Sequence, residues 1–270
     1  MGNIEKLVNK EGFAFALSID CEGTNFDKNL ENNAKNLERL LRLNSKNNIY
    51  TILFITPYFA DMLCKLNLVR LRTTQSCVRS KVIFGLHIHP DNLPEEIKIH
   101  CPFINHEEKL LAAYSYEEQK IIIKHSMDYL YGKGINPIEI FRGGYFSMDD
   151  NTSKALKELT DINYESHNIY RKQYKVTKNL LTPVPVYAFD SNEELRLEYF
   201  STEKLVQMLA EAIKDNKKAL GITHSYLLDP EDLHYKRDNI AKDIHYRLKE
   251  LIKVIKLYKQ AIEPIENIKL

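Results

Sequence analysis

Two carboxylates stand at the end of the first apolar run of the chain. This run spans residues 13–19 and is followed directly by Asp20-Cys21-Glu22. Residues two apart on an extended chain project to the same side, so Asp20 and Glu22 can share a site while Cys21 turns aside. Two carboxylates held together can divide their roles, one binding a metal ion and the other handling protons. Taken alone, the segment is as compatible with a structural role, a turn with a helix-capping aspartate, as with a functional site.

A pair of histidines ends a later apolar run, in the segment His87-Ile88-His89-Pro90. Pro90 ends the predicted strand because it has no N–H to donate, so both rings stand at the carboxyl end. At this spacing the two imidazoles face one side and can reach one divalent ion. A lone His-x-His is more often structural, but a pair at the end of a buried strand favours metal binding.

Two more polar groups follow predicted strands. Phe141-Arg142-Gly143-Gly144-Tyr145-Phe146 brings a guanidinium and a closely approachable backbone to one rim, where backbone N–H groups could stabilise an oxyanion. His224, in Thr223-His224-Ser225, is suited to proton transfer near neutral pH. An arginine that pairs with a surface carboxylate is the structural alternative for Arg142.

Short apolar runs alternate with helical patterns along the whole chain, which predicts an α/β architecture. The predicted strands are 13–19, 49–55, 82–88, 138–141, 162–165, 183–188 and 219–223. Helices are predicted near 31–43, 57–66, 115–131, 149–160 and 201–214, and a last one carries Ile240, Ile244, Leu248, Leu251 and Ile255 on one face. About seven strands with intervening helices suit either a barrel or an open doubly wound sheet, and in both cases the chemistry should lie at the carboxyl ends of the strands. Of the two, we expect one domain over 1–270 that forms a distorted (β/α) barrel with about seven parallel strands.

Bulk composition narrows the class of protein. The 270 residues include 38 basic and 37 acidic side chains, a formal charge of +1 that predicts no general attraction to nucleic acid. No stretch approaches the roughly 20 apolar residues of a membrane span, and the run at 13–19 is predicted to be a buried strand rather than a signal peptide. Four cysteines without a C-x-x-C pair favour reduced thiols and a cytoplasmic location.

The order Asp-x-Glu, His-x-His-Pro, Phe-Arg-Gly-Gly-Tyr and Thr-His resembles the motif series of polysaccharide deacetylases of the NodB-homology type (carbohydrate esterase family 4-like). The resemblance spans Ile19 to Ser225 and is greatest to cytoplasmic members linked to O-antigen and other surface-glycan biosynthesis. It implies a metal-dependent hydrolase that removes an N-acetyl group from an amino sugar or glycan precursor. The sequence carries no indication of oligomeric state.

The resemblance also implies a role for each site residue. Asp20 matches the catalytic base that activates metal-bound water, Arg142 the arginine that holds this base, and His224 the general acid. The implied ligands of one divalent ion, Zn²⁺ first with Co²⁺ or Ni²⁺ as alternatives, are Glu22, His87 and His89. The Tyr145 backbone N–H matches the oxyanion donor, and Glu165 falls in a less regular motif that implies a substrate contact, as does Tyr145.

Two departures from the motif series leave alternatives open. Asp-Cys-Glu replaces the usual Asp-Asp pair, and one residue rather than three separates the histidines. One alternative is a different metal-dependent amidohydrolase or phosphoesterase, because such barrels also use His-x-His at a strand end. The other is a catalytically inactive, glycan-binding relative. Release of acetate from an N-acetylated sugar would distinguish the deacetylase from both of these alternatives.

Overall fold

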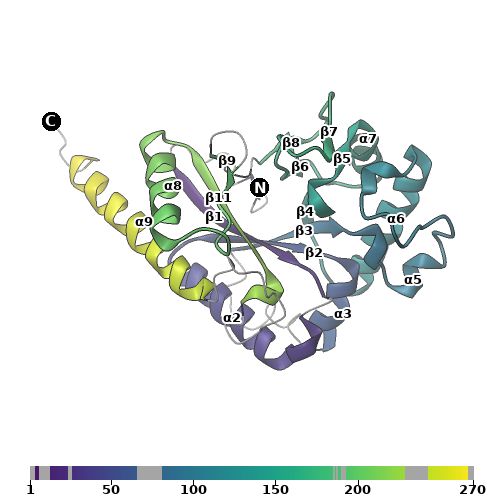
Figure 1. The fold of residues 1–270 in the computed structure, drawn as a ribbon, viewed down its shortest axis with the longest axis horizontal. Helices are drawn as coiled ribbons and strands as arrows, with labels where there is room; N and C mark the ends of the chain where they lie inside the picture. The colour runs from purple at the N-terminus through teal and green to yellow at the C-terminus, as the bar shows by residue number, and fades with distance from the viewer. Residues whose placement is uncertain are drawn as a thin grey trace.

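A seven-stranded parallel sheet forms the centre of the fold (Figure 1). This computed structural model describes residues 4–5, 13–23, 26–65, 81–184, 186, 188–189, 193–228 and 243–266. The strand order is β11-β1-β2-β3-β4-β6-β8, and every neighbouring pair is parallel. The strands are β1 (Ala14–Cys21), β2 (Tyr50–Ile55), β3 (Val82–Ile88), β4 (Ile138–Gly143), β6 (Tyr164–Glu165), β8 (Thr182–Pro183) and β11 (Lys218–His224).

Helices cover the outside of the curled sheet, which confirms the predicted distorted (β/α) barrel (Figure 1). They are α2 (Leu30–Lys46), α3 (Pro57–Lys65), α5 (Glu95–Lys98), α6 (Tyr116–Gly132), α7 (Asp150–Leu159), α8 (Thr202–Lys214) and α9 (Ile244–Glu266). Two small pairs lie beside the sheet: β5 (Met148–Asp149) with β7 (Tyr174–Lys175), and β9 (Ala188–Phe189) with β10 (Glu193–Glu194).

Local sequence signals explain where several helices begin and what they bury. Ser115 and Glu118 form a reciprocal capping box at the start of α6, because each side chain accepts a backbone N–H of the other residue. The predicted stripe of α9 is buried from Ile244 through Leu248 and Leu251 to Ile255, while Ile240 lies outside the described residues.

Three predictions about the elements were wrong in part. The region 162–165 contributes only the two-residue β6, and the predicted strand 183–188 is divided between β8 and β9, which belong to different sheets. Pro183 and Pro185 have no N–H, so this segment cannot continue one ladder. Asp20 and Arg142 lie within β1 and β4 rather than after them.

The two faces of the sheet bury different side chains. On the outer face Leu17, Ile19 and Cys21 belong to the large cluster packed beneath the helices. On the inner face a smaller apolar cluster includes Ala16, Phe54, Ile83, Ile140 and Leu220. Because side chains alternate along a strand, this inner face continues toward the carboxyl ends as Asp20, His87, Arg142 and His224. The barrel interior is thus apolar at one end and polar at the other.

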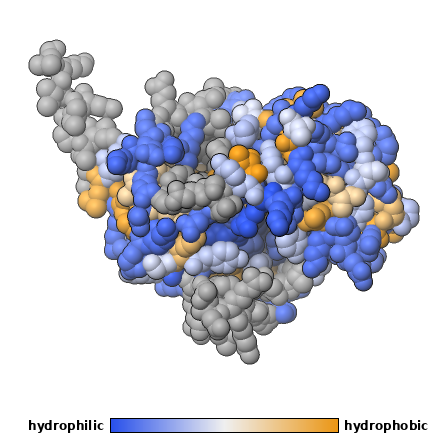
Figure 2. Space-filling view, turned by 45° about the horizontal axis from the view of Figure 1, so that its top comes forward, coloured by the Kyte–Doolittle hydropathy of each residue, from blue (hydrophilic) through white to orange (hydrophobic). Residues whose placement is uncertain are grey.

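The described residues on the face of the molecule in Figure 2 are mainly hydrophilic, and the hydrophobic side chains there form small, separate patches. Among the described residues, no helix has the length and apolar character needed to cross a membrane. Cys21 and Cys101 are buried free thiols, and the side chains of Cys64 and Cys77 lie outside the described residues.

Candidate active site

A cavity of about 360 Å³ opens at the carboxyl ends of the strands. It is lined by residues of β1, β3, β4 and β11 and of the turns that follow them, together with Arg171, Gln173, Arg196 and Tyr199 from other segments. The predicted site residues in its lining are Asp20, Glu22, His87, His89, Arg142, Tyr145 and His224. The structure therefore brings together every predicted site residue except Glu165.

Glu22, His87 and His89 direct three donor atoms at one point. Glu22 Oε1 lies 3.2 Å from His89 Nε2 and 3.5 Å from His87 Nε2, and the two Nε2 atoms are 3.2 Å apart. Among the described residues this is the one group of three such side chains with the spacing of a metal site. Bonds of about 2.0–2.1 Å in a tetrahedral zinc site place neighbouring ligand atoms roughly 3.4 Å apart. The donor set therefore fits a single divalent ion, and strand alternation explains why one intervening residue suffices.

The orientation of both histidine rings is set by backbone. His87 Nδ1 lies 2.7 Å from the carbonyl oxygen of Arg142. A carbonyl only accepts, so Nδ1 carries the proton and Nε2 keeps its lone pair for the cavity. The ring of His89 packs directly on Gly144, where a Cβ atom would come within 2.7 Å of its atoms. A residue without a side chain is therefore required at Gly144 for His89 to occupy its present position.

Asp20 and Arg142 form a buried ion pair behind the metal-ligand group. Arg142 Nη1 lies 2.5 Å from Asp20 Oδ1, and its other N–H groups donate to Ser18 Oγ and to the carbonyl and hydroxyl oxygens of Ser166. The guanidinium also stacks over the Phe54 ring, 4.0 Å from its centroid. Burial by itself would raise the pKa of Asp20, but Arg142 above all, then His87 and His224, hold that pKa below its usual value. The carboxylate is therefore kept ionised.

His224 faces Asp20 and Glu22 from the end of β11. Its Nε2 lies 4.0 Å from Asp20 Oδ2 and 3.9 Å from Glu22 Oε1, while Nδ1 lies 3.3 Å from Glu198 Oε1. Burial alone would lower the pKa of His224, but the hydrogen bond to Glu198 and the surrounding carboxylates raise it above its usual value. A protonated imidazole is thus favoured beside an ionised carboxylate, the arrangement that an acid–base pair requires.

Glu165 stands apart from the cavity. It is 1% exposed and binds the His167 ring through Nδ1 at 2.7 Å, the Tyr174 hydroxyl at 3.2 Å and the Asn179 amide at 2.9 Å. His167 Nε2 in turn accepts the Gly143 N–H at 2.8 Å. Glu165 thereby acts on the turn after β4 through His167 and does not line the cavity.

Two solved structures share this architecture. A candidate polysaccharide deacetylase from Mycobacterium smegmatis has a TM-score of 0.59 and 12% identity, covering 91% of this chain and 84% of that one. A carbohydrate esterase family 4 (CE4) pseudoenzyme from Bacillus anthracis has a TM-score of 0.51 and 11% identity, covering 94% of this chain and 62% of that one. The chain has the fold of these CE4-type structures. No protein-family model and no curated protein matches the sequence.

Within this CE4-type fold, Glu198 is a site residue that the sequence analysis missed. It is fully buried and comes from an extended segment beside β11, with Leu197 N–H donating to the Ile222 carbonyl and Ile222 N–H to that of Leu195. A signal was present, because the stretch 194–198 reads Glu-Leu-Arg-Leu-Glu, a period of two typical of a strand. Its apolar residues face the core and its charged ones face the cavity side.

The turn after β4 also differs from an ordinary helix-like turn. Tyr145 and Phe146 both adopt left-handed conformations, with φ of 55° and 59°. Non-glycine residues in this region cost about 1–3 kcal/mol each, and such residues cluster at functional sites. The turn carries Tyr145 to the cavity rim, where the residue is 51% exposed and its ring packs edge-on against His89.

Proposed function

We propose that this protein is a metal-dependent carbohydrate N-deacetylase, which hydrolyses the acetamide of an N-acetylated sugar or glycan precursor to acetate and a free amine. The observation that carries the proposal is the meeting in one cavity of the Glu22-His87-His89 group with the Asp20–Arg142 ion pair and with His224, whose ring is held from behind the cavity wall by the buried Glu198. The fold shared with a candidate polysaccharide deacetylase supports it.

The residues divide the reaction among them. A divalent ion held by Glu22, His87 and His89, Zn²⁺ first and otherwise Co²⁺ or Ni²⁺, would polarise the acetyl carbonyl and lower the pKa of water toward about 7. Asp20, kept ionised by Arg142, accepts the proton of the attacking water.

Tyr145 and His224 carry the remaining steps. The Tyr145 backbone N–H donates to the developing oxyanion, an interaction worth about 2.7–4 kcal/mol in comparable sites. His224 then protonates the leaving nitrogen as its C–N bond breaks, with Glu198 holding the ring in place.

The proposal includes a cytoplasmic location and a role in surface-glycan biosynthesis. The motif order resembles cytoplasmic members linked to O-antigen and surface-glycan biosynthesis, and the buried thiols of Cys21 and Cys101 are consistent with a reducing compartment. The near-neutral formal charge gives no reason to expect a nucleic-acid partner.

Metal content and acetate release, measured together, test the proposal. Wild-type protein should hold about one ion per chain by mass spectrometry and release acetate from N-acetylated sugars, as a catalytic site with open positions would. His87→Ala/His89→Ala should lose both properties. His100→Ala/His125→Ala removes the stacked histidine pair between the α5 end and α6 and serves as the matched control.

Two other outcomes would overturn it. Bound metal with hydrolysis of phosphate esters and no acetate would assign the site to another class of metallohydrolase. Wild-type protein that takes up none of Zn²⁺, Co²⁺ or Ni²⁺ but binds glycans, with binding unaltered in Asp20→Asn, would identify an inactive relative.

A further inference from the structure

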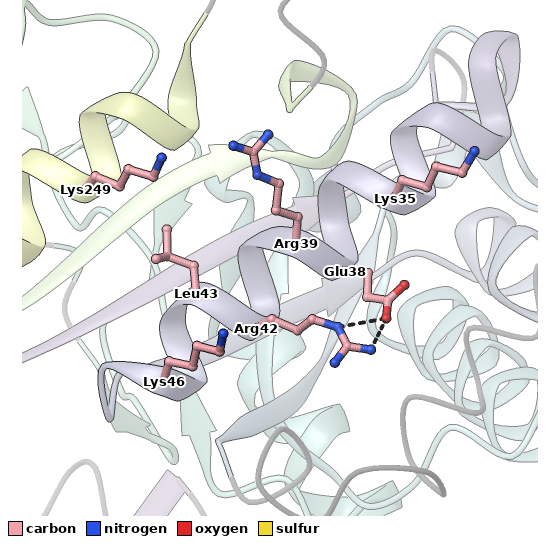
Figure 3. A pocket seen from close by; sticks show the side chains of 7 residues that line it. All are labelled: Lys35, Glu38, Arg39, Arg42, Leu43, Lys46 and Lys249. Atoms are coloured by element: carbon pink, nitrogen blue, oxygen red, sulfur yellow. Dashed lines mark hydrogen bonds and ion pairs between the residues drawn. The ribbon is translucent and has the colours of Figure 1, made fainter.

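A basic groove lies on the outside of the barrel, between α2 and α9 (Figure 3). It encloses about 480 Å³ and shares no residue with the catalytic cavity. Its five cations are Lys35, Arg39, Arg42 and Lys46 from α2 and Lys249 from α9, against a single carboxylate, Glu38. Since the whole chain has a formal charge of +1, this groove is a local concentration of positive charge.

The α2 cations form one stripe. Lys35, Arg39, Arg42 and Lys46 are separated by four, three and four residues, the spacing that aligns side chains on one face of a helix. The opposite face of α2 is buried through Leu37, Leu40, Leu41 and Asn44. The stripe is therefore held outward by the packing of α2 on the sheet.

Most of these cations lack an acidic partner. Arg42 pairs with Glu38 on the next turn, as the dashed lines in Figure 3 show. Within the described part of the chain, the side chains of Lys35, Arg39, Lys46 and Lys249 form no ion pair or hydrogen bond. By contrast, several lysines elsewhere on the described surface do, including Lys98, Lys120, Lys124 and Lys133.

The positive field reaches the side chain buried beside the groove. His245 on α9 is 5% exposed, and neither ring nitrogen has a hydrogen-bond partner among the described residues. Burial first, and then the charge of Arg39, lower the pKa of His245 to about 4. The five cations and single carboxylate of the groove favour an anion over an added cation, and the lowered pKa of His245 agrees with this charge.

We propose that this groove is a second ligand site, which binds an oligophosphate group. The stripe from Lys35 to Lys46 extends over about 16 Å at 1.5 Å per residue, too long for one phosphate and suited to linked ones. Guanidinium groups match phosphate oxygens in a planar fork, and lysines add point charges around them. Lys249 closes the groove from the other helix, so the anion is held between α2 and α9.

Calorimetric titration of the full chain with inorganic triphosphate at low salt tests this site. Arg39→Gln/Lys249→Gln removes one cation from each wall, and Lys178→Gln/Lys214→Gln removes two exposed cations elsewhere as a matched control. Wild type and control should bind alike, with affinity falling as salt rises, and the groove variant should bind at least about tenfold more weakly. Acetate release should be the same in all three proteins.

The proposal fails if wild type does not bind triphosphate, or if both double variants lose affinity equally, which would reflect net charge alone. It also fails if the groove variant binds as wild type does. Two further arms separate the sources of the ligand. Groove-dependent binding of ATP in solution supports a free oligophosphate, and groove-dependent sedimentation with vesicles of phosphatidylcholine and phosphatidylinositol bisphosphate supports a lipid headgroup.

Discussion

The ionisable side chains of the cavity are held by partners that come from other parts of the chain. Asp20 is paired with Arg142, His224 with Glu198, and the His87 ring with a backbone carbonyl of β4. Each contact fixes a proton, an orientation or a charge that the side chain would not keep in water. At the scale of the residue, function depends on these pairs as much as on the groups that would touch substrate.

Gly144→Ala should weaken metal binding by about 10–100-fold, the usual effect of disturbing the surroundings of a metal ligand. The new Cβ would come within 2.7 Å of the His89 ring, so the ring must move. Competition with a chelator measures the affinity. Gly132→Ala, where a Cβ meets no atom within 4 Å, is the control and should bind metal as wild type does. Equal affinity in both variants would show that His89 is not held in this way.

Glu198→Gln should lower kcat for acetate release without changing KM or metal content, because Glu198 contacts His224 and not the metal-ligand group. The loss should reach at most the roughly 10²–10⁴-fold that general acid catalysis contributes. Glu198→Asp, which keeps the carboxylate, should recover part of the rate. An unchanged kcat in Glu198→Gln would remove this residue from the mechanism.

Strands and helices convert local sequence periodicity into a site. Alternation along β1, β3, β4 and β11 brings Asp20, His87, Arg142 and His224, one from each strand, to the inner face at the cavity. Helices do the complementary work outside, where α2 and α9 bury apolar stripes and leave their basic faces to solvent. This packing also buries a polar side chain of α9. The ring of His245 is buried with no polar partner among the described residues.

The pH dependence of stability should reflect His245. Its folded pKa of about 4 is below the unfolded value of 6.5, so folding favours the neutral ring. The contribution of His245 to the free energy of unfolding is present above pH 6.5. It is lost as pH falls from 6.5 toward 4, because the unfolded chain binds the proton first. Urea unfolding measures the free energy of unfolding at pH 7 and at pH 5. Its decrease between the two pH values should be smaller in His245→Gln than in wild type, and the exposed variant His106→Gln serves as the control. The same loss in all three proteins would contradict this assignment.

Arg142 connects distant parts of the whole molecule. It extends from β4 to Asp20 and Ser18 on β1 and to Ser166 after β6, and it is 1% exposed. The ion pair and hydrogen bonds of Arg142 therefore join three segments of the barrel where its polar end begins. A buried pair of this kind is costly to break because the remaining charge has no partner.

Arg142→Met should lower the free energy of unfolding by about 3–5 kcal/mol, the usual effect of leaving one partner of a buried ion pair behind. Lys124→Met, which removes an exposed pair with Asp128 on α6, should lower it by no more than about 0.5 kcal/mol. Chemical denaturation of both variants measures the difference. A loss below 1 kcal/mol in Arg142→Met would argue that the pair is not structural.

Features that depend on neighbours along the chain could be predicted. Apolar runs and helical spacing predicted an α/β fold with parallel strands, suited to a barrel or an open doubly wound sheet, and period-two alternation predicted that His87 and His89 face one side. The helix predicted near 115–131 likewise corresponds to α6, whose start is set by the local capping box of Ser115 and Glu118. These patterns are local because backbone geometry alone decides where each side chain points.

Contacts between distant segments were decided only in the tertiary structure. The alternation around Glu198 indicated a strand, but its place beside β11, and hence its contact with His224, depends on chain packing across 26 residues. Glu165 was expected in the cavity, yet it faces His167 and acts through it. Lys249 joins the α2 stripe for the same reason, because α9 packs beside α2. Local sequence determines the direction of a side chain, whereas the fold determines which side chain it meets.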